Sequence, residues 1–169
     1  MICTPLVGGR KEDVLRELAV ILPKEPDVIE WRIDYFKNIG DLAEVLELAR
    51  TIKEAAGPIP ILFVCRSARE GGGTIPLGDG EVVRLYSTLC DSKLVDLIDY
   101  ELDNPPERRE QLRKASMLCS RRNGSGFTLC CLGHSLVLMI GRQRNALRTR
   151  ARVLIGSLGG GLITTNRQK

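Results

Sequence analysis

No acidic residue follows Glu110. All 21 Asp and Glu residues lie within residues 1–110 together with 14 Lys and Arg, whereas residues 111–169 contain 11 Lys and Arg and no acid. The overall net charge of +4 therefore conceals a first segment with a net charge of −7 and a second with a net charge of +11. This break divides the chain into an N-terminal part, residues 1–116, and a basic C-terminal part, residues 117–169.

Several other features are also missing. No uncharged apolar run reaches the roughly 18 residues that a membrane-spanning helix needs. The N-terminus has no basic segment and no cleavage-type site, so no secretion signal is predicted. The six cysteines form no C-x-x-C pair and no zinc-type spacing with the single histidine. We therefore expect a cytoplasmic protein without a metal site, long enough for one globular domain.

The N-terminal part alternates between short apolar strands and amphipathic helices. Asp41 and Asp79 are predicted as N-caps of the second and third helices. The alternation is typical of parallel strands joined by crossover helices, in an open sheet or in a closed barrel. Strands are predicted at residues 2–7, 28–34, 60–66 and 94–102, and helices at 12–22, 42–56, 80–90 and from 105 to at least 115.

The strand at residues 28–34 reads V-I-E-W-R-I-D. Because side chains alternate along a strand, Glu30, Arg32 and Asp34 share one face and the apolar residues share the other. A half-buried strand with a solvated polar face explains this pattern without any function. The alternative is a binding site, since Arg66 and Glu101 also end predicted strands, and ligands bind at the carboxyl ends of parallel strands.

Four collinear segments carry a family resemblance: I-C-T-P-L-V-G at 2–8, E-W-R-I-D-Y-F at 30–36, I-L-F-V-C-R-S-A-R-E-G-G at 61–72 and V-D-L-I-D-Y-E-L at 95–102. Together they resemble type I 3-dehydroquinate dehydratase over residues 1 to about 116. The resemblance implies a (βα)₈ TIM barrel, incomplete here with four to five βα units, and a homodimer. It implies a lyase of the shikimate pathway, which serves aromatic amino acid biosynthesis. The enzyme removes water from 3-dehydroquinate through a Schiff base to a lysine, without metal or organic cofactor.

The resemblance also assigns residues. Glu30, Arg32 and Arg66 match residues that contact the substrate, and Glu70 matches the acid that orients the catalytic histidine. His134, the single histidine, is the candidate catalytic base, although it comes later than the family spacing and lacks the following Asp-Phe. A structural role is the alternative for His134. Structural roles, such as capping loops or bonding across the barrel, are predicted for Asp34, Asp99 and Glu101.

The resemblance leaves the Schiff-base lysine unidentified. After Glu70 the only lysines are Lys93, Lys114 and Lys169, and none lies in an apolar strand where burial would lower its pKa. We hypothesise that the reading frame is truncated or replaced near residue 116. A half barrel would then leave an unpaired strand edge and would dimerise or aggregate. A catalytically inactive fragment that still binds substrate is therefore an alternative function.

A nucleic-acid binder is a further alternative of a different class. Arginines at 142, 144, 148, 150 and 152 form a basic segment, and three of them would line one face of a helix. Such a stripe binds phosphates of nucleic acid or an anionic membrane surface. No aromatic residue follows Phe127, so base stacking is not supported. The resemblance therefore favours a small-molecule substrate, with neither nucleic acid nor membrane as a partner.

Overall fold

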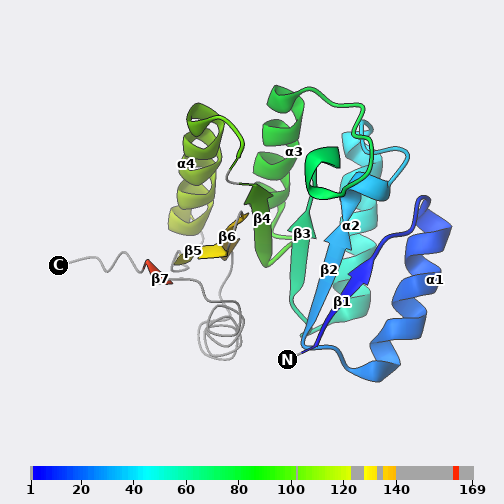
Figure 1. The fold of residues 1–169 in the computed structure, drawn as a ribbon. Helices are drawn as coiled ribbons and strands as arrows, with labels where there is room; N and C mark the ends of the chain where they lie inside the picture. Colours follow the sequence, from blue (N-terminus) through cyan, green and yellow to red (C-terminus); the bar gives the residue numbers. More distant parts are fainter. Residues whose placement is uncertain (1, 102, 123–127, 133–134, 140–161, 164–169) are drawn as a thin grey trace.

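A computed structural model describes residues 2–101, 103–122, 128–132, 135–139 and 162–163. Its N-terminal part consists of four strands and four helices in strict alternation (Figure 1). The strands run parallel, as predicted, and their order in the sheet is β1-β2-β3-β4. The strands are β1 (Cys3–Leu6), β2 (Val28–Arg32), β3 (Ile61–Val64) and β4 (Leu97–Glu101), and the helices are α1 (Lys11–Ile21), α2 (Leu42–Ala56), α3 (Asp79–Ser92) and α4 (Pro106–Arg122).

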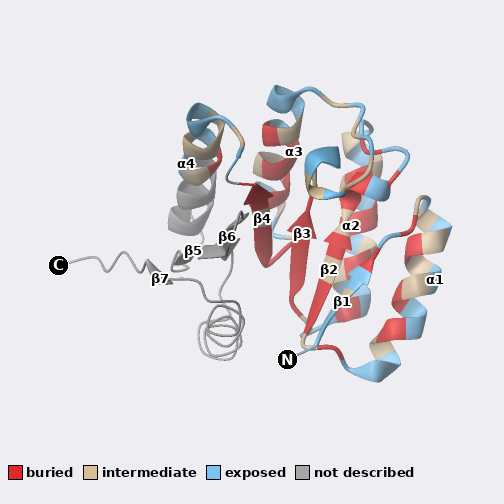
Figure 2. Ribbon diagram, in the orientation of Figure 1, coloured by how far each residue is buried: buried red, intermediate tan, exposed pale blue. Residues whose placement is uncertain are grey.

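The apolar core lies between the sheet and the helices. Each crossover steps to the next strand in the same direction, and right-handed crossovers then place their helices on one face of the sheet. Figure 2 shows the buried residues concentrated on β2, β3, β4 and the helix surfaces that face them. Trp31, Phe63, Tyr86 and Leu48 are among the largest fully buried side chains of this core. The four predicted βα units of an α/β fold are therefore present.

Edge-to-face aromatic contacts cross this core from β2 to β4. Trp31 meets Phe63 with ring centroids 5.5 Å apart, Phe63 meets Tyr86 at 5.1 Å, and Tyr86 meets Tyr100 at 5.3 Å. The Tyr86 hydroxyl accepts a hydrogen bond from the Cys65 amide at 2.8 Å and donates one to the Asp99 carbonyl at 2.6 Å. Tyr86 of α3 thus connects β3 and β4 by both packing and hydrogen bonding.

The helix boundaries follow local capping chemistry. The Asp41 carboxylate accepts hydrogen bonds from the amides of Ala43 and Glu44, which confirms the predicted N-cap of α2. The prediction for α3 was wrong by one residue, because Asp79 is already helical and Gly78 is the N-cap. Glu81 accepts a hydrogen bond from the Gly78 amide at 2.8 Å, and this is the interaction that orders the start of the helix.

The strands are shorter than predicted at their carboxyl ends. β2 ends at Arg32, and residues Ile33–Tyr35 form a 3₁₀ turn, so Asp34 leaves the strand alternation. β3 ends at Val64, and β4 begins at Leu97 rather than at residue 94. The turn after β2 directs the Asp34 side chain toward neighbouring backbone amides, which is the basis of the site described below.

Among the described residues, no parallel fifth barrel strand pairs with β4, because the strand at residues 128–132 runs in the same direction as β4 but is separated from it by an antiparallel strand. β5 (Thr128–Leu132) and β6 (Ser135–Met139) are antiparallel to each other, and β6 pairs antiparallel with β4. A short strand β7 (Leu162–Ile163) pairs with β5. The expected open edge of β4 is therefore covered by β6, and the described units number four rather than five.

Candidate active site

Two rows of side chains define the face of the sheet opposite the helices. In the parallel register, Glu30 lies beside Leu62 and Leu62 beside Leu97, while Arg32 lies beside Val64 and Val64 beside Asp99. The alternating residues of these strands, including Trp31, Phe63 and Ile98, belong to the helix-facing core. We call the face formed by these six side chains the site face. Its apolar centre is Leu62, Val64 and Leu97, and its charged groups are Glu30, Arg32 and Asp99.

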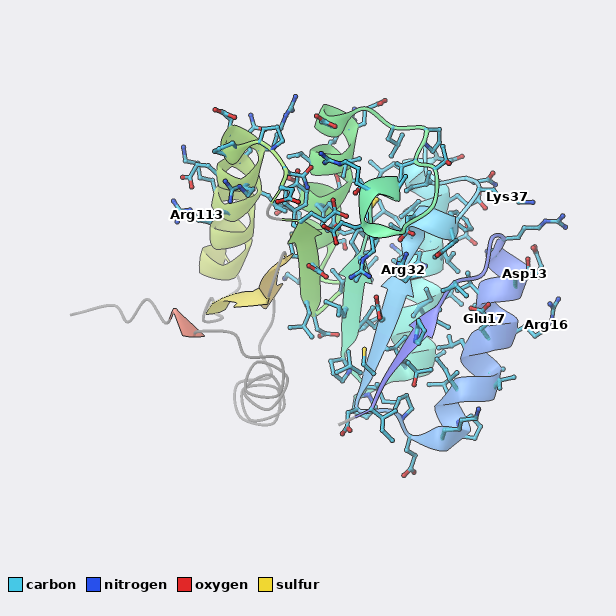
Figure 3. The ribbon with its side chains drawn as sticks, viewed as in Figure 1. Asp13, Arg16, Glu17, Arg32, Lys37 and Arg113 are labelled. Carbon is cyan, nitrogen blue, oxygen red and sulfur yellow. The ribbon has the colours of Figure 1, made fainter. Side chains whose placement is uncertain are left out.

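Arg32 lies at the carboxyl end of β2 (Figure 3). It is held there by a two-point ion pair with Asp34. Its Nε donates to Oδ1 of Asp34 at 2.9 Å, and its Nη2 donates to Oδ2 at 2.8 Å. The Arg32 side chain is 12% exposed and that of Asp34 is 0% exposed. The guanidinium also lies 4.9 Å from the centre of the Tyr35 ring. Hydrogen bonding to Asp34 raises the pKa of Arg32 and outweighs the opposing effect of burial.

The same carboxylate holds the segment that follows β3. Oδ1 of Asp34 accepts a hydrogen bond from the Arg66 amide at 3.2 Å, and Oδ2 accepts one from the Gly73 amide at 3.0 Å. Burial alone would raise the pKa of Asp34, but the bonds from Arg32, Gly73 and Arg66 together lower it below its ordinary value. Asp34 therefore remains ionised at neutral pH and joins β2 to both ends of residues 66–73.

Residues 66–73, which we call the β3 loop, approach other backbone segments very closely. A Cβ at Gly72 would collide with the Arg66 carbonyl oxygen, and one at Gly73 would collide with the Asp34 carbonyl oxygen. Glu101 binds the loop from the other side, because its carboxylate accepts a hydrogen bond from the Ser67 amide at 2.6 Å. The predicted loop-capping roles of Asp34 and Glu101 are confirmed by these contacts.

The structure brings some of the predicted site residues together. Glu30 and Arg32 share the site face, and Arg66 begins the β3 loop at the carboxyl end of β3. Glu70 lies in the 3₁₀ turn of that loop, followed by Gly71 at φ 80°, a conformation that favours glycine. His134 lies outside the described residues, as do the arginines of segment 142–152 and Lys169.

The described strands contain no lysine. Lys93 is the C-cap of α3, and Lys114 lies in α4 with its Nζ 3.8 Å from Glu110. Lys53 pairs with Asp96 at 2.6 Å, next to the start of β3. None of these lysines lies on the site face. The described part of the chain thus places charged groups on the site face, but it places no lysine there.

A cavity of about 600 Å³ lies between the β3 loop and the segments that lead into α3 and α4. Cys65, Ser67, Tyr100 and Glu101 contribute to its lining, together with residues of the segments leading into α3 and α4. Glu30, Arg32, Arg66 and Glu70 are absent from the described lining of this cavity. Burial, followed by the charges of Asp34 and Glu101, raises the pKa of the Cys65 thiol to about 12. We therefore place the candidate site on the site face and not in this cavity.

Sequence reasoning missed one residue that organises the site. Tyr86 was not among the site residues predicted from sequence, yet its hydroxyl links the end of β3 to β4. A tyrosine in an otherwise apolar helix stripe was the available signal, because a buried phenol hydroxyl requires hydrogen-bond partners. No group of three or more potential metal-ligating side chains occurs in the described residues. Within the same residues, no helix has the length and apolarity needed to cross a membrane.

Comparisons with known proteins identify the family to which this fold belongs. A family model described as type I 3-dehydroquinase matches residues 2–119. The chain belongs to the type I 3-dehydroquinase family. It is 50% identical over 116 residues to the 3-dehydroquinate dehydratase of Albidiferax ferrireducens, and 46% identical over 119 residues to that of Geobacillus kaustophilus. These matches cover 69% and 70% of the chain.

Solved 3-dehydroquinate dehydratases match the chain in structure over part of their length. The crystal structure of the Geobacillus kaustophilus enzyme matches with a TM-score of 0.68 at 46% identity, over 70% of this chain and 46% of that one. The Clostridium difficile enzyme, solved with covalently modified comenic acid, matches with a TM-score of 0.67 at 31% identity. The chain spans less than half the length of the relatives, 44% for Albidiferax ferrireducens. The described units are thus part of a TIM-barrel fold.

Proposed function

We propose that this chain acts on 3-dehydroquinate as a type I 3-dehydroquinate dehydratase, eliminating water to give 3-dehydroshikimate. The observation that carries the proposal is the ion-paired Arg32 at the end of β2, within a family match that covers residues 2–119. The substrate is a polyhydroxylated anion, and its recognition requires guanidinium donors beside carboxylate acceptors on a rigid support. Glu30 and Arg32 on the site face, with Arg66 at its edge, supply these groups.

We infer the residue roles from the family match. Glu30, Arg32 and Arg66 hold the hydroxyl and carboxylate groups of the substrate. Glu70 orients a histidine, for which His134 is the candidate. In this reaction a lysine amine condenses with the substrate ketone and releases water, and the imine acidifies the neighbouring C–H bond. The histidine takes that proton, returns one to the departing hydroxyl, and hydrolysis of the imine regenerates the amine.

A second candidate function is substrate binding without turnover. The observation that favours it is the absence of lysine from the described strands. We propose that residues 1–116 form the N-terminal part of the dehydratase barrel and that residues 117–169 form a distinct basic segment. We also propose a homodimer. We further propose a cytoplasmic location, which is supported by the lack of a disulfide at the described residues Cys3 and Cys65.

The two candidates are separated by trapping the imine. The purified chain is incubated with 3-dehydroquinate, reduced with borohydride and weighed as an intact protein, with a sample that lacks substrate as the control. An active dehydratase gains one substrate-sized mass on a single lysine, which peptide mapping identifies, and it produces the ultraviolet absorbance of a conjugated enone. Binding in calorimetry with neither adduct nor absorbance identifies the inactive binder. Absence of both binding and adduct contradicts both candidates.

A further inference from the structure

The Asp34 carboxylate makes four hydrogen bonds with its two oxygens. Each oxygen accepts one bond from the Arg32 guanidinium and one from a backbone amide of the β3 loop, Arg66 for Oδ1 and Gly73 for Oδ2. Both acceptor atoms are thus engaged by donors from two different elements. An aspartate that only capped a loop would not need its second pair of bonds to an arginine of the site face.

Asp34 holds the Arg32 guanidinium and the amides of Arg66 and Gly73, and fixed positions of these groups favour ligand binding at the site face. Arg32 is a long side chain with high rotamer freedom, and its ordering before binding lowers the entropic cost of binding. The amides of Arg66 and Gly73 begin and end the β3 loop, so fixing both amides limits the motion of Glu70 between them. The close approach of Gly73 to the Asp34 carbonyl oxygen leaves no room for a side chain, which shows that the loop is packed directly on this turn.

We propose that Asp34 is a positioning residue that presets Arg32 and the β3 loop, and with that loop Arg66 and Glu70, before the substrate binds. What the positioned groups bind rests on the function proposed above. Asp34 itself presents no free carboxylate oxygen lone pair to a ligand in this arrangement, because each oxygen already accepts two hydrogen bonds. Its effect on binding is therefore exerted through Arg32 and the loop.

The chain offers a matched control for this proposal. Asp96 is also buried, also pairs with a cation, Lys53, and also accepts a hydrogen bond from a backbone amide, that of Ile61. Ile61 begins β3, so Asp96 acts at the opposite end of the strand from the β3 loop. Asp34→Asn and Asp96→Asn thus make the same chemical change and each weakens one ion pair and one strand-end contact.

The test compares these two variants by nuclear magnetic resonance of the ¹⁵N-labelled chain. For Asp34→Asn we expect solvent exchange of the Arg32 Nε–H and of the Arg66 and Gly73 amides to become at least about tenfold faster. This factor corresponds to the loss of a charge-assisted hydrogen bond. For Asp96→Asn the same signals stay within about twofold of the unaltered chain. Equal exchange in the two variants would overturn the proposal, whether or not the chain binds 3-dehydroquinate.

Calorimetric titration with 3-dehydroquinate supplies a second measurement. If the unaltered chain binds, we expect Asp34→Asn to weaken the affinity about tenfold and Asp96→Asn to leave it nearly unchanged. If the unaltered chain does not bind, the proposed function fails and the exchange data alone decide the role of Asp34. If Asp34→Asn does not fold, Gly73→Ala perturbs the same contact from the loop side. Gly73→Ala should speed solvent exchange of the amides of residues 66 and 73, while the Arg32 Nε–H stays protected from exchange. Unchanged exchange of these amides would contradict the proposal.

Discussion

At the residue scale, the site depends on a buried charge that is stabilised by directed bonds. Moving a carboxylate from water into a protein is costly unless its oxygens are hydrogen-bonded and a counter-charge is near. Asp34 meets both conditions, since its 0% exposed side chain accepts bonds from the Arg32 guanidinium and two amides. All these donors share the Asp34 carboxylate as their acceptor, so loss of its charge is expected to weaken all four bonds together.

This coupling predicts a specific response to acid. Because the pKa of Asp34 in the folded chain lies below its ordinary value of 3.8, the carboxylate contributes stability that is complete above that value and is lost as the pH falls through the folded pKa. The Arg32 guanidinium, the charged partner that faces it, stays protonated throughout this range. We expect the Arg32 Nε–H and Gly73 amide resonances to shift together with a common midpoint below 3.8. Separate midpoints, or a midpoint above 3.8, would show that the two groups are not coupled through Asp34.

At the scale of the elements, α3 contributes to the site through Tyr86. Its ring packs edge-to-face with Phe63 of β3 and Tyr100 of β4, and its hydroxyl binds the Cys65 amide and the Asp99 carbonyl. Cys65 immediately precedes the β3 loop. The helix thereby fixes the spacing between β3 and β4 where the loop begins, one residue before the amide that Asp34 holds.

Removal of this hydroxyl should destabilise the fold measurably. Tyr86→Phe keeps the aromatic packing but leaves the buried Cys65 amide without its acceptor, which costs roughly 1–3 kcal/mol in the free energy of unfolding. Tyr35→Phe is the control, because Tyr35 is 41% exposed and its hydroxyl makes no protein hydrogen bond among those described. Urea denaturation followed by circular dichroism gives both values. A cost for Tyr86→Phe no larger than that for Tyr35→Phe would mean that water replaces the hydroxyl.

The elements were largely predictable from sequence, and the site contacts only in part. Apolar periodicity located all four βα units because each amphipathic helix and buried strand has a local signature. The register that places Glu30 beside Leu62, and the turn that points Asp34 at Arg66 and Gly73, depend on pairing between distant segments. Such pairing is not encoded in any single stretch of sequence.

At the scale of the whole molecule, the two edges of the parallel sheet differ, because β1 is a terminal strand whereas β4 is paired with β6. β1 is the terminal strand of the sheet and contains Pro5, a residue without an amide donor that is tolerated on edge strands. β4 is paired along its entire length, Leu97–Glu101, with β6. The direction of β6 could not be predicted, because apolar runs at 128–132 and 135–139 are equally compatible with a parallel fifth strand and with a hairpin.

The pairing of β6 predicts how the chain behaves when it is shortened. A chain that ends at Arg122, the last residue of α4, lacks β5 and β6 and exposes the backbone donors and acceptors of β4. We expect this variant to self-associate in sedimentation experiments at concentrations where the complete chain gives a smaller species. Hydrogen exchange assigns the edge, since association through β4 protects the amides of Leu97–Glu101, whereas association through β1 protects those of Cys3–Leu6. A shortened chain that remains monomeric with unprotected β4 amides would show that β6 is not needed to cover this edge, and that the open half barrel resists edge pairing by itself.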